Sequence, residues 1–192
     1  LLGLDIGASG VKACLLKESK RGLQLHVFDS IELPDEAIVE GAVMNSGVIV
    51  DAVRELLGRN KIRQKECAMA VAGYSVIIKK ITMDRMKEAE AREVIRWEAE
   101  QQVPFDMDNV ELDFQVLDPE GDGLQMTVLL VAAKRELVDN KMALLTEVGL
   151  TPSIIDVDSF ALHNAFEVNY PDGMRGVVGL VNVGHEMTNV NI

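Results

Sequence analysis

The chain begins with an acidic side chain, a glycine-rich turn and a lysine in close succession. Asp5 ends an apolar run, and Lys12 lies within the apolar run that follows the turn. The turn between them consists of Gly7, Ala8, Ser9 and Gly10. A turn that presents neighbouring backbone N–H groups can bind an anion, a carboxylate can hold a hydrated Mg²⁺, and a lysine can meet a phosphate as a point charge. The spacing therefore predicts a phosphate-binding hairpin with its own metal-anchoring carboxylate.

Two other interpretations of this motif follow from the residues themselves. Glycines are common in hairpin turns, so a turn without any ligand stays open as an alternative. A Walker P-loop and a Rossmann fingerprint are both excluded, because in those motifs a helix follows the glycines, whereas here a strand pattern follows.

A related pattern appears near the end of the chain. The residues VVGLVNVGHEMTNVNI, at 177–192, read as an apolar strand, a turn at Gly184 and the start of a second strand after Thr188. This internal echo of the opening stretch indicates two hairpins of the same kind.

Composition excludes several classes of function. A formal net charge of −12 argues against a nucleic-acid-binding surface. The two cysteines, Cys14 and Cys67, lie in apolar strand-like runs and are expected to be buried and reduced, without a zinc-binding arrangement. The chain has no signal peptide and no apolar run near the ~18 residues that span a bilayer. We expect a cytoplasmic protein, and the apolar residues at both ends indicate part of a longer chain.

Hydrophobic periodicity predicts the elements that position the first hairpin. Leu23–Leu33 alternates as a third strand, and Asn45 can cap a helix that ends at Gly58. Glu66–Gly73 is a nearly continuous apolar strand of the buried parallel kind. A strand, a covering helix and a parallel strand predict a layered α/β domain.

The middle of the chain differs from the rest in composition. Asp84–Gln102 is a highly charged helical stretch that carries the only tryptophan, Trp97, which we expect to pack at a helix seam. Two alternating runs flank a turn at 118–123, and an amphipathic helix follows at Glu136–Val148. A strand at Thr151–Val157 then leads to a helix that Asp158 or Ser159 can cap. Residues 83–150 thus form a compact inserted subdomain.

The two hairpins, LDIGASGVKA and VNVGHEMTNV, resemble the two phosphate motifs of the actin/Hsp70/sugar-kinase superfamily. Two further stretches, IIKKITMDRMKEAEAREVIRWEAEQQVPF and LVAAKRELVDNKMALLTEVGLTPSIIDVDSFALHNAF, are similar to those of one branch, the PilM family of type IV pilus assembly proteins. The resemblance implies an α/β, actin-like (ribonuclease H-like) first domain at 1–82 and 151–176. It also implies an inserted α+β subdomain at 83–150 and the beginning of a second, truncated actin-like domain at 177–192.

The resemblance also implies cofactors, ATP and Mg²⁺. Asp5 matches the acidic residue that organises Mg²⁺ through water, and it is the catalytic candidate. The residues that match ATP-binding positions are Gly7, Ala8, Ser9, Gly10, Lys12, Asn182, Gly184 and Thr188. Asn182 stands where many members have aspartate, and residues 185–187 stand where a glycine-rich turn is usual. We therefore expect at most a weak ATPase.

In biological terms the resemblance implies a cytoplasmic scaffold at the inner-membrane face of the type IV pilus machine. Its partners would be the N-terminal cytoplasmic tail of PilN and other inner-membrane and motor components, with membrane association only through these partners. The PilN tail would lie in a groove between the first domain and the insert. The residues expected to flank that groove are Tyr74, Val76, Val94 and Trp97.

Two alternatives remain open. A small-molecule kinase of the same superfamily would need a catalytic base, for which Asp156 and Asp158 are available, although a strand end and a helix cap also explain them. A scaffold that does not bind nucleotide, similar to the secretion protein GspL, stays open because of the altered second motif.

Overall fold

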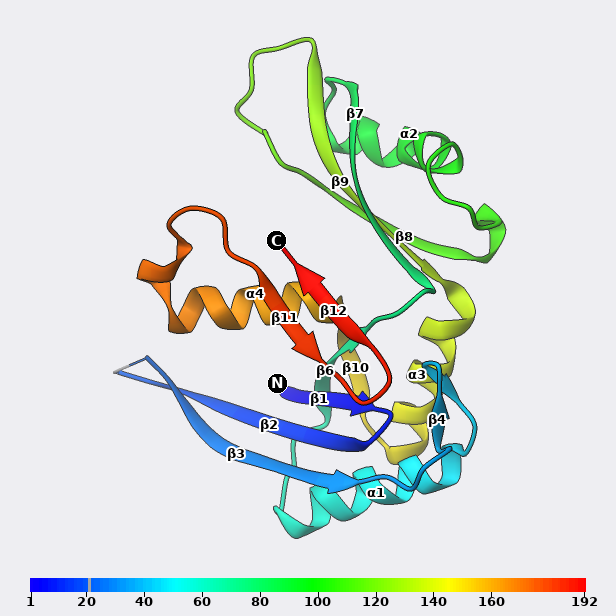
Figure 1. The fold of residues 1–192 in the computed structure, drawn as a ribbon, viewed down its shortest axis with the longest axis vertical. Coiled ribbons are helices and arrows are strands. Elements are labelled where there is room, and N and C mark those ends of the chain that lie inside the picture. The colour runs from blue at the N-terminus through cyan, green and yellow to red at the C-terminus, as the bar shows by residue number, and fades with distance from the viewer. Residues whose placement is uncertain (21) are drawn as a thin grey trace. The chain divides into compact units, whose positions relative to one another are not determined.

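The computed structural model describes residues 1–20 and 22–192, which divide into two compact units (Figure 1). Unit 1 comprises Leu1–Gly73 and Asn140–Ile192, and unit 2 comprises Tyr74–Asp139. Each unit has its own hydrophobic core.

Unit 1 is built on a five-stranded sheet. Strands β1 (Leu2–Gly7), β2 (Gly10–Ser19) and β3 (Gly22–Glu32) form an antiparallel meander. On the other side of β1, the strands β6 (Glu66–Val71) and β10 (Thr151–Val157) run parallel to it, which gives the order β10-β6-β1-β2-β3. The predicted meander and the predicted buried parallel strand are both confirmed.

Helices α1 (Ser46–Arg59) and α3 (Arg135–Val148) share the core of this sheet. The side chain of Asn45 caps α1 as predicted, but the helix continues through Gly58 and ends one residue later. Ile49, Val53 and Leu56 of α1 are fully buried together with Leu2 of β1, which anchors the strand that carries Asp5. Burying side chains of this size stabilises a fold by about 1.5–3 kcal/mol each.

A short hairpin precedes α1 that sequence reasoning did not predict. It consists of β4 (Ile38–Val39) and β5 (Ala42–Val43), and its turn contains Glu40 at φ 50° and Gly41 at φ 81°. Two-residue strands carry too little alternation to be recognised from the sequence.

Unit 2 is a three-stranded antiparallel sheet covered by one helix. The sheet has the order β7-β9-β8, formed by β7 (Val76–Asp84), β9 (Gln125–Lys134) and β8 (Val110–Val116). Helix α2 (Glu88–Glu100) packs Ala91, Ile95 and Ala99 into the core, and a 3₁₀ turn, η1 (Met107–Asn109), leads into β8. The unit begins and ends earlier than the predicted insert at 83–150, because β7 pairs with β9 along its whole length while the end of α3 packs in the core of unit 1.

The last elements of the chain belong to unit 1. Helix α4 (Asp158–Asn169) is followed by a 3₁₀ turn, η2 (Pro171–Met174), and by a two-stranded sheet of β11 (Leu180–Val183) and β12 (Thr188–Asn191). The predicted capping of α4 is wrong. The helix begins at Asp158 itself, and its N-cap position is Val157, which provides no side-chain hydrogen bond. Within the described residues, no helix is long and apolar enough to cross a membrane.

Candidate functional site

The first hairpin joins β1 to β2 through Ala8 and Ser9, with Gly7 and Gly10 paired across the ladder. No residue of this turn has a positive φ, so its glycines are not needed for a left-handed conformation. Gly10 is required for a different reason. A Cβ at this position would lie 2.7 Å from the carbonyl oxygen of Ile31 in β3, whereas a Cβ at Gly7 meets only an ordinary contact at 3.7 Å.

Asp5 and Lys12 stand opposite each other in the same hairpin. Lys12 Nζ lies 2.8 Å from Asp5 Oδ2, and the two side chains remain 50% and 65% exposed, respectively. An ion pair this exposed contributes at most about 1 kcal/mol. Both charged groups are therefore accessible to an anion or a hydrated cation at the end of β1.

The turn of the second hairpin, β11–β12, also brings a backbone carbonyl close to a glycine. The Gly184 N–H donates to the Met187 carbonyl at 2.9 Å, and a Cβ on Gly184 would lie 2.7 Å from that oxygen. Asn182 and Thr188 flank the turn and are exposed. The turn contacts two distant loops of unit 1, because the Glu40 N–H donates to Glu186 Oε2 at 2.8 Å and Met187 packs beside Gly73.

Polar side chains of β12 connect this hairpin to the start of α4. Asn189 Nδ2 donates to Asp158 Oδ2 at 2.6 Å, and Asn191 Nδ2 donates to the Ser159 carbonyl at 3.1 Å. Burial raises the pKa of Asp158, while hydrogen bonds from the Ser159 N–H and Asn189 act in the opposite direction. The Ser159 hydroxyl beside it is buried and, within the described residues, has no hydrogen-bond partner. Asp156, by contrast, accepts the N–H of Val157.

Lys141 of α3 is the third charged group near these carboxylates. Burial lowers its pKa, and the nearby charges of Asp5 and Asp158 oppose that change. Asp5 in turn contributes to the raised pKa of Asp158. The fold therefore brings Asp5, Asp158 and Lys141 from three separate elements into one electrostatic cluster.

Sequence reasoning missed Lys141 and Asn189. Lys141 was detectable, because it lies on the apolar stripe of the predicted helix, three and four residues before the buried Leu144 and Leu145. A lysine in such a position is unusual without a partner charge. Asn189 carries no comparable indication, since it alternates with Val190 in an ordinary strand pattern.

The donor set of this cluster fits a phosphate-bound Mg²⁺ better than a metal held by protein alone. Within the residues that the structure describes, no group of three or more His, Cys, Asp and Glu side chains could hold a metal ion. Mg²⁺ usually binds through one or two carboxylates together with waters and substrate phosphates. Asp5 and Asp158 supply two carboxylates, and the two turns supply backbone N–H groups.

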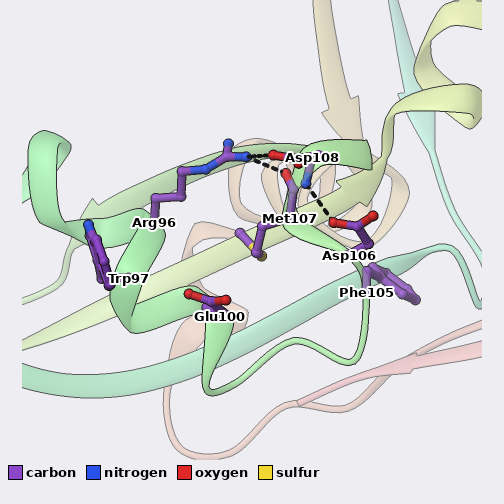
Figure 2. Close-up of a pocket in the computed structure, with 7 residues that line it drawn as sticks. All are labelled: Arg96, Trp97, Glu100, Phe105, Asp106, Met107 and Asp108. Carbon is purple, nitrogen blue, oxygen red and sulfur yellow. Dashed lines mark hydrogen bonds and ion pairs between the residues drawn. The ribbon is translucent and has the colours of Figure 1, made fainter.

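The four residues predicted to flank a peptide groove all belong to unit 2. Tyr74 is 88% exposed, and Val76 is the first residue of β7 and pairs with Ala133 of β9. Val94 packs against the core of unit 2. Trp97 does not pack at a helix seam, as the sequence suggested, but is 74% exposed on α2 at the edge of a pocket (Figure 2).

A model of the type IV pilus assembly protein PilM matches residues 3–192. The chain belongs to the PilM family. A chain of the PilM–PilN type IV pilus biogenesis complex superposes with a TM-score of 0.87 and 30% identity, over 98% of this chain and 56% of that one. The predicted actin-like fold is confirmed.

A second solved structure is similar in fold alone. It is the cytoplasmic domain of EpsL, an inner-membrane component of the type II secretion system of Vibrio cholerae, with a TM-score of 0.57 and 10% identity. The match covers 84% of this chain and 58% of the EpsL chain. The present chain thus spans a little over half the length of both similar structures.

Proposed function

We propose that this member of the PilM family is a scaffold of the type IV pilus assembly machine that binds the cytoplasmic N-terminal tail of a PilN-type membrane partner. The observation that carries this proposal is the match, over nearly the whole chain, to a chain from a PilM–PilN complex. The scaffold would act in the cytoplasm at the inner-membrane face and reach the membrane through its partners.

Unit 2 offers a physical means of holding such a tail. β7 is an edge strand of the β7-β9-β8 sheet, and its far edge can accept an additional strand. An extended peptide that adds to a sheet edge gains affinity from main-chain hydrogen bonds and specificity from alternate side chains. Tyr74 and Val76 precede and begin this strand, so we propose that they contact the side chains of the tail.

Calorimetric titration of a synthetic PilN tail tests this function. We expect saturable binding to the chain, and Tyr74→Ala should weaken it by about ten-fold, as loss of a contacting aromatic does. Tyr170→Ala, which also removes an exposed tyrosine but lies in unit 1, serves as the matched control. Failure of a folded sample to bind, or equal effects of the two variants, would argue against this proposal.

We further propose that the two hairpins bind the phosphates of ATP. The specific support is the cluster of Asp5, Lys12, Asp158 and Lys141, which places an exposed ion pair and two carboxylates in one unit. In this proposal the backbone N–H groups of both turns and the Lys12 ammonium hold phosphate oxygens. Asp5, through water, and Asp158 hold Mg²⁺, which would neutralise phosphate charge when bound.

Lys12→Ala, made in the full-length protein, tests the assignment of this hairpin as a phosphate-binding site. The variant should weaken Mg-ATP binding by at least about ten-fold, the scale of one charge-assisted hydrogen bond. Lys17→Ala, on the same strand and also exposed, should leave the affinity within about two-fold, because a distant surface charge is screened by salt. Unchanged affinity in the Lys12 variant would refute the assignment.

The same titration separates the alternatives. Absence of nucleotide binding would favour a scaffold that works without nucleotide. Sugar-dependent ATP turnover would favour a kinase, and Asp158 is then the better candidate base. It lies in the charged cluster with Asp5 and Lys141.

A further inference from the structure

A second candidate site lies wholly within unit 2. A pocket of about 360 Å³ opens between the C-terminal half of α2 and the segment 105–108. Arg96, Trp97 and Glu100 come from the helix, and Phe105, Asp106, Met107 and Asp108 come from the segment (Figure 2). Its volume lies in the range of small-ligand sites.

The pocket combines an apolar floor with an exposed aromatic wall. Met107 is 8% exposed and belongs to the core of unit 2, so its thioether provides a fixed apolar surface. Trp97 is the only tryptophan of the chain and leaves 74% of its surface in solvent. The ring of Phe105 already carries the ammonium of Lys134 at 5.1 Å from its centroid. Phe105 is also half-buried, so Trp97 is the more exposed of the two aromatic side chains that line the pocket.

Among the described residues, the charged groups of the pocket leave one carboxylate side chain without a partner. Arg96 is extended toward Asp108, where it donates to Asp108 Oδ1 at 3.0 Å and to the Met107 carbonyl at 2.7 Å (Figure 2). Asp106 accepts from the Asp108 N–H at 3.1 Å and from Asn109. Within the part of the chain that the structure describes, the side chain of Glu100 makes neither a hydrogen bond nor an ion pair. It is exposed beside Trp97.

We propose that this pocket receives an arginine side chain from a partner protein. A guanidinium stacks on an indole, pairs with a carboxylate through its planar fork, and lays its aliphatic stem on an apolar surface. Trp97, Glu100 and Met107, which line the same pocket, supply these three features. A basic partner also complements the charge of the helix, because α2 carries five glutamates against two arginines.

Arginine fits this pocket better than lysine. A lysine ammonium is strongly hydrated and acts as a point charge, so it gains little from a planar aromatic wall. The guanidinium is planar and more weakly hydrated, and Trp is the aromatic residue that binds cations best. The site is independent of the proposed tail-binding edge and of the hairpins, so its failure leaves those proposals intact.

Because Trp97 is the only tryptophan, its fluorescence reports directly on this site. The probe is an acetylated and amidated Gly-Leu-Arg-Leu-Gly peptide, and the matched probe carries citrulline in place of arginine. We expect the arginine peptide to change the Trp97 emission saturably and to bind about five-fold more tightly than the citrulline peptide, the factor that one exposed cation–π contact and ion pair provide.

Variants of two glutamates on one helix complete the test. Glu100→Gln should remove most of the preference for arginine over citrulline. Glu93→Gln, which makes the same charge change on an exposed part of α2 outside the pocket, should retain that preference. A preference that survives in Glu100→Gln, equal binding of the two peptides, or no saturable change would overturn the proposal. Circular dichroism confirms that both surface variants are folded.

Discussion

The two hairpins of unit 1 share one steric constraint but differ in what holds them. At Gly10 and at Gly184, an added Cβ would lie 2.7 Å from a carbonyl oxygen. The first hairpin lies inside the five-stranded sheet, where Val11 and Ala13 of β2 are fully buried. The second forms a two-stranded sheet, and its valines Val181, Val183 and Val190 are 60–76% exposed.

This difference shows how one turn geometry can be fixed in two ways. Hydrophobic burial on both strands fixes the first hairpin, so its position changes only if the core changes. The second hairpin is held by side-chain hydrogen bonds, in which Glu186 accepts and Asn189 and Asn191 donate. Each such bond contributes only about 0.5–1.5 kcal/mol, so the second hairpin is held less firmly than the first.

The largest effect is expected from Gly10→Ala. The new Cβ would collide with the backbone of β3, which cannot move without disturbing the core of the sheet. We expect a loss of about 2–3 kcal/mol in the free energy of unfolding, measured by urea denaturation. Gly7→Ala in the same turn meets only an ordinary contact and should cost less than about 1 kcal/mol. Equal losses for the two variants would show that the close approach to Ile31 is not what demands glycine.

A smaller and more local effect is expected from Asn189→Ala. The substitution removes the hydrogen bond to Asp158, and we expect amide exchange in residues 180–191 to become about five-fold faster, equivalent to about 1 kcal/mol. Asn182→Ala changes the residue directly opposite on β11 and serves as the control. Hydrogen-exchange mass spectrometry distinguishes the two. If both variants accelerate exchange equally, loss of strand pairing rather than the Asp158 contact would be the cause.

Asp158 adds a pH dependence to the second hairpin. Because burial raises its pKa in the folded chain, the folded state retains the proton more strongly than the unfolded state does. The stability that the protonated Asp158 side chain provides is complete below the ordinary aspartate pKa. It is lost as the pH rises through the raised pKa of Asp158 in the folded chain. Asp158→Asn keeps a neutral side chain at every pH, so its urea midpoint should exceed that of the parent at pH 7. That advantage should disappear in acid, and an advantage that instead grew on acidification would contradict this sign.

Much of the fold could be predicted, because in unit 1 the apolar positions that can be recognised in the sequence are also the buried positions. The apolar positions of β1, β2 and β6 alternate or run continuously in the sequence, and those same positions form the core. The sequence predicts that an inserted unit exists, but not the residues at which it begins and ends. Its boundaries depend on the pairing of β7 with β9, which is a long-range contact that no local pattern encodes.

The candidate site was only partly predictable, for a physical reason. Asp5 and Lys12 could be recognised because a hairpin places them opposite each other at a fixed spacing. Lys141, Asp158 and Asn189 meet through the packing of α3, α4 and β12, which residue spacing cannot reveal. Trp97 was assigned to a helix seam because tryptophans are usually buried, whereas here the buried face of α2 is formed by Ala91, Ile95 and Ala99.

The smallest effect concerns the contact between Glu186 and Glu40. In this contact the Glu186 carboxylate on the second hairpin accepts the N–H of Glu40. The backbone of Glu40 has a φ of 50°, which is unusual for a residue other than glycine. Removing the carboxylate in Glu186→Ala should make the Glu40 amide exchange about two- to three-fold faster by NMR, since the bond is exposed and worth about 0.5 kcal/mol. The global urea midpoint should not change measurably.

Glu186→Gln sharpens this last prediction, because it keeps an acceptor oxygen and removes only the charge. If geometry holds the contact, the Gln variant should restore slow exchange at Glu40, and His185→Ala in the same turn should leave it unaltered. If exchange in Glu186→Gln is as fast as in Glu186→Ala, the negative charge is the essential feature. The second hairpin would then be held by electrostatics that a bound anion can weaken, in contrast to the first hairpin, whose core no anion reaches.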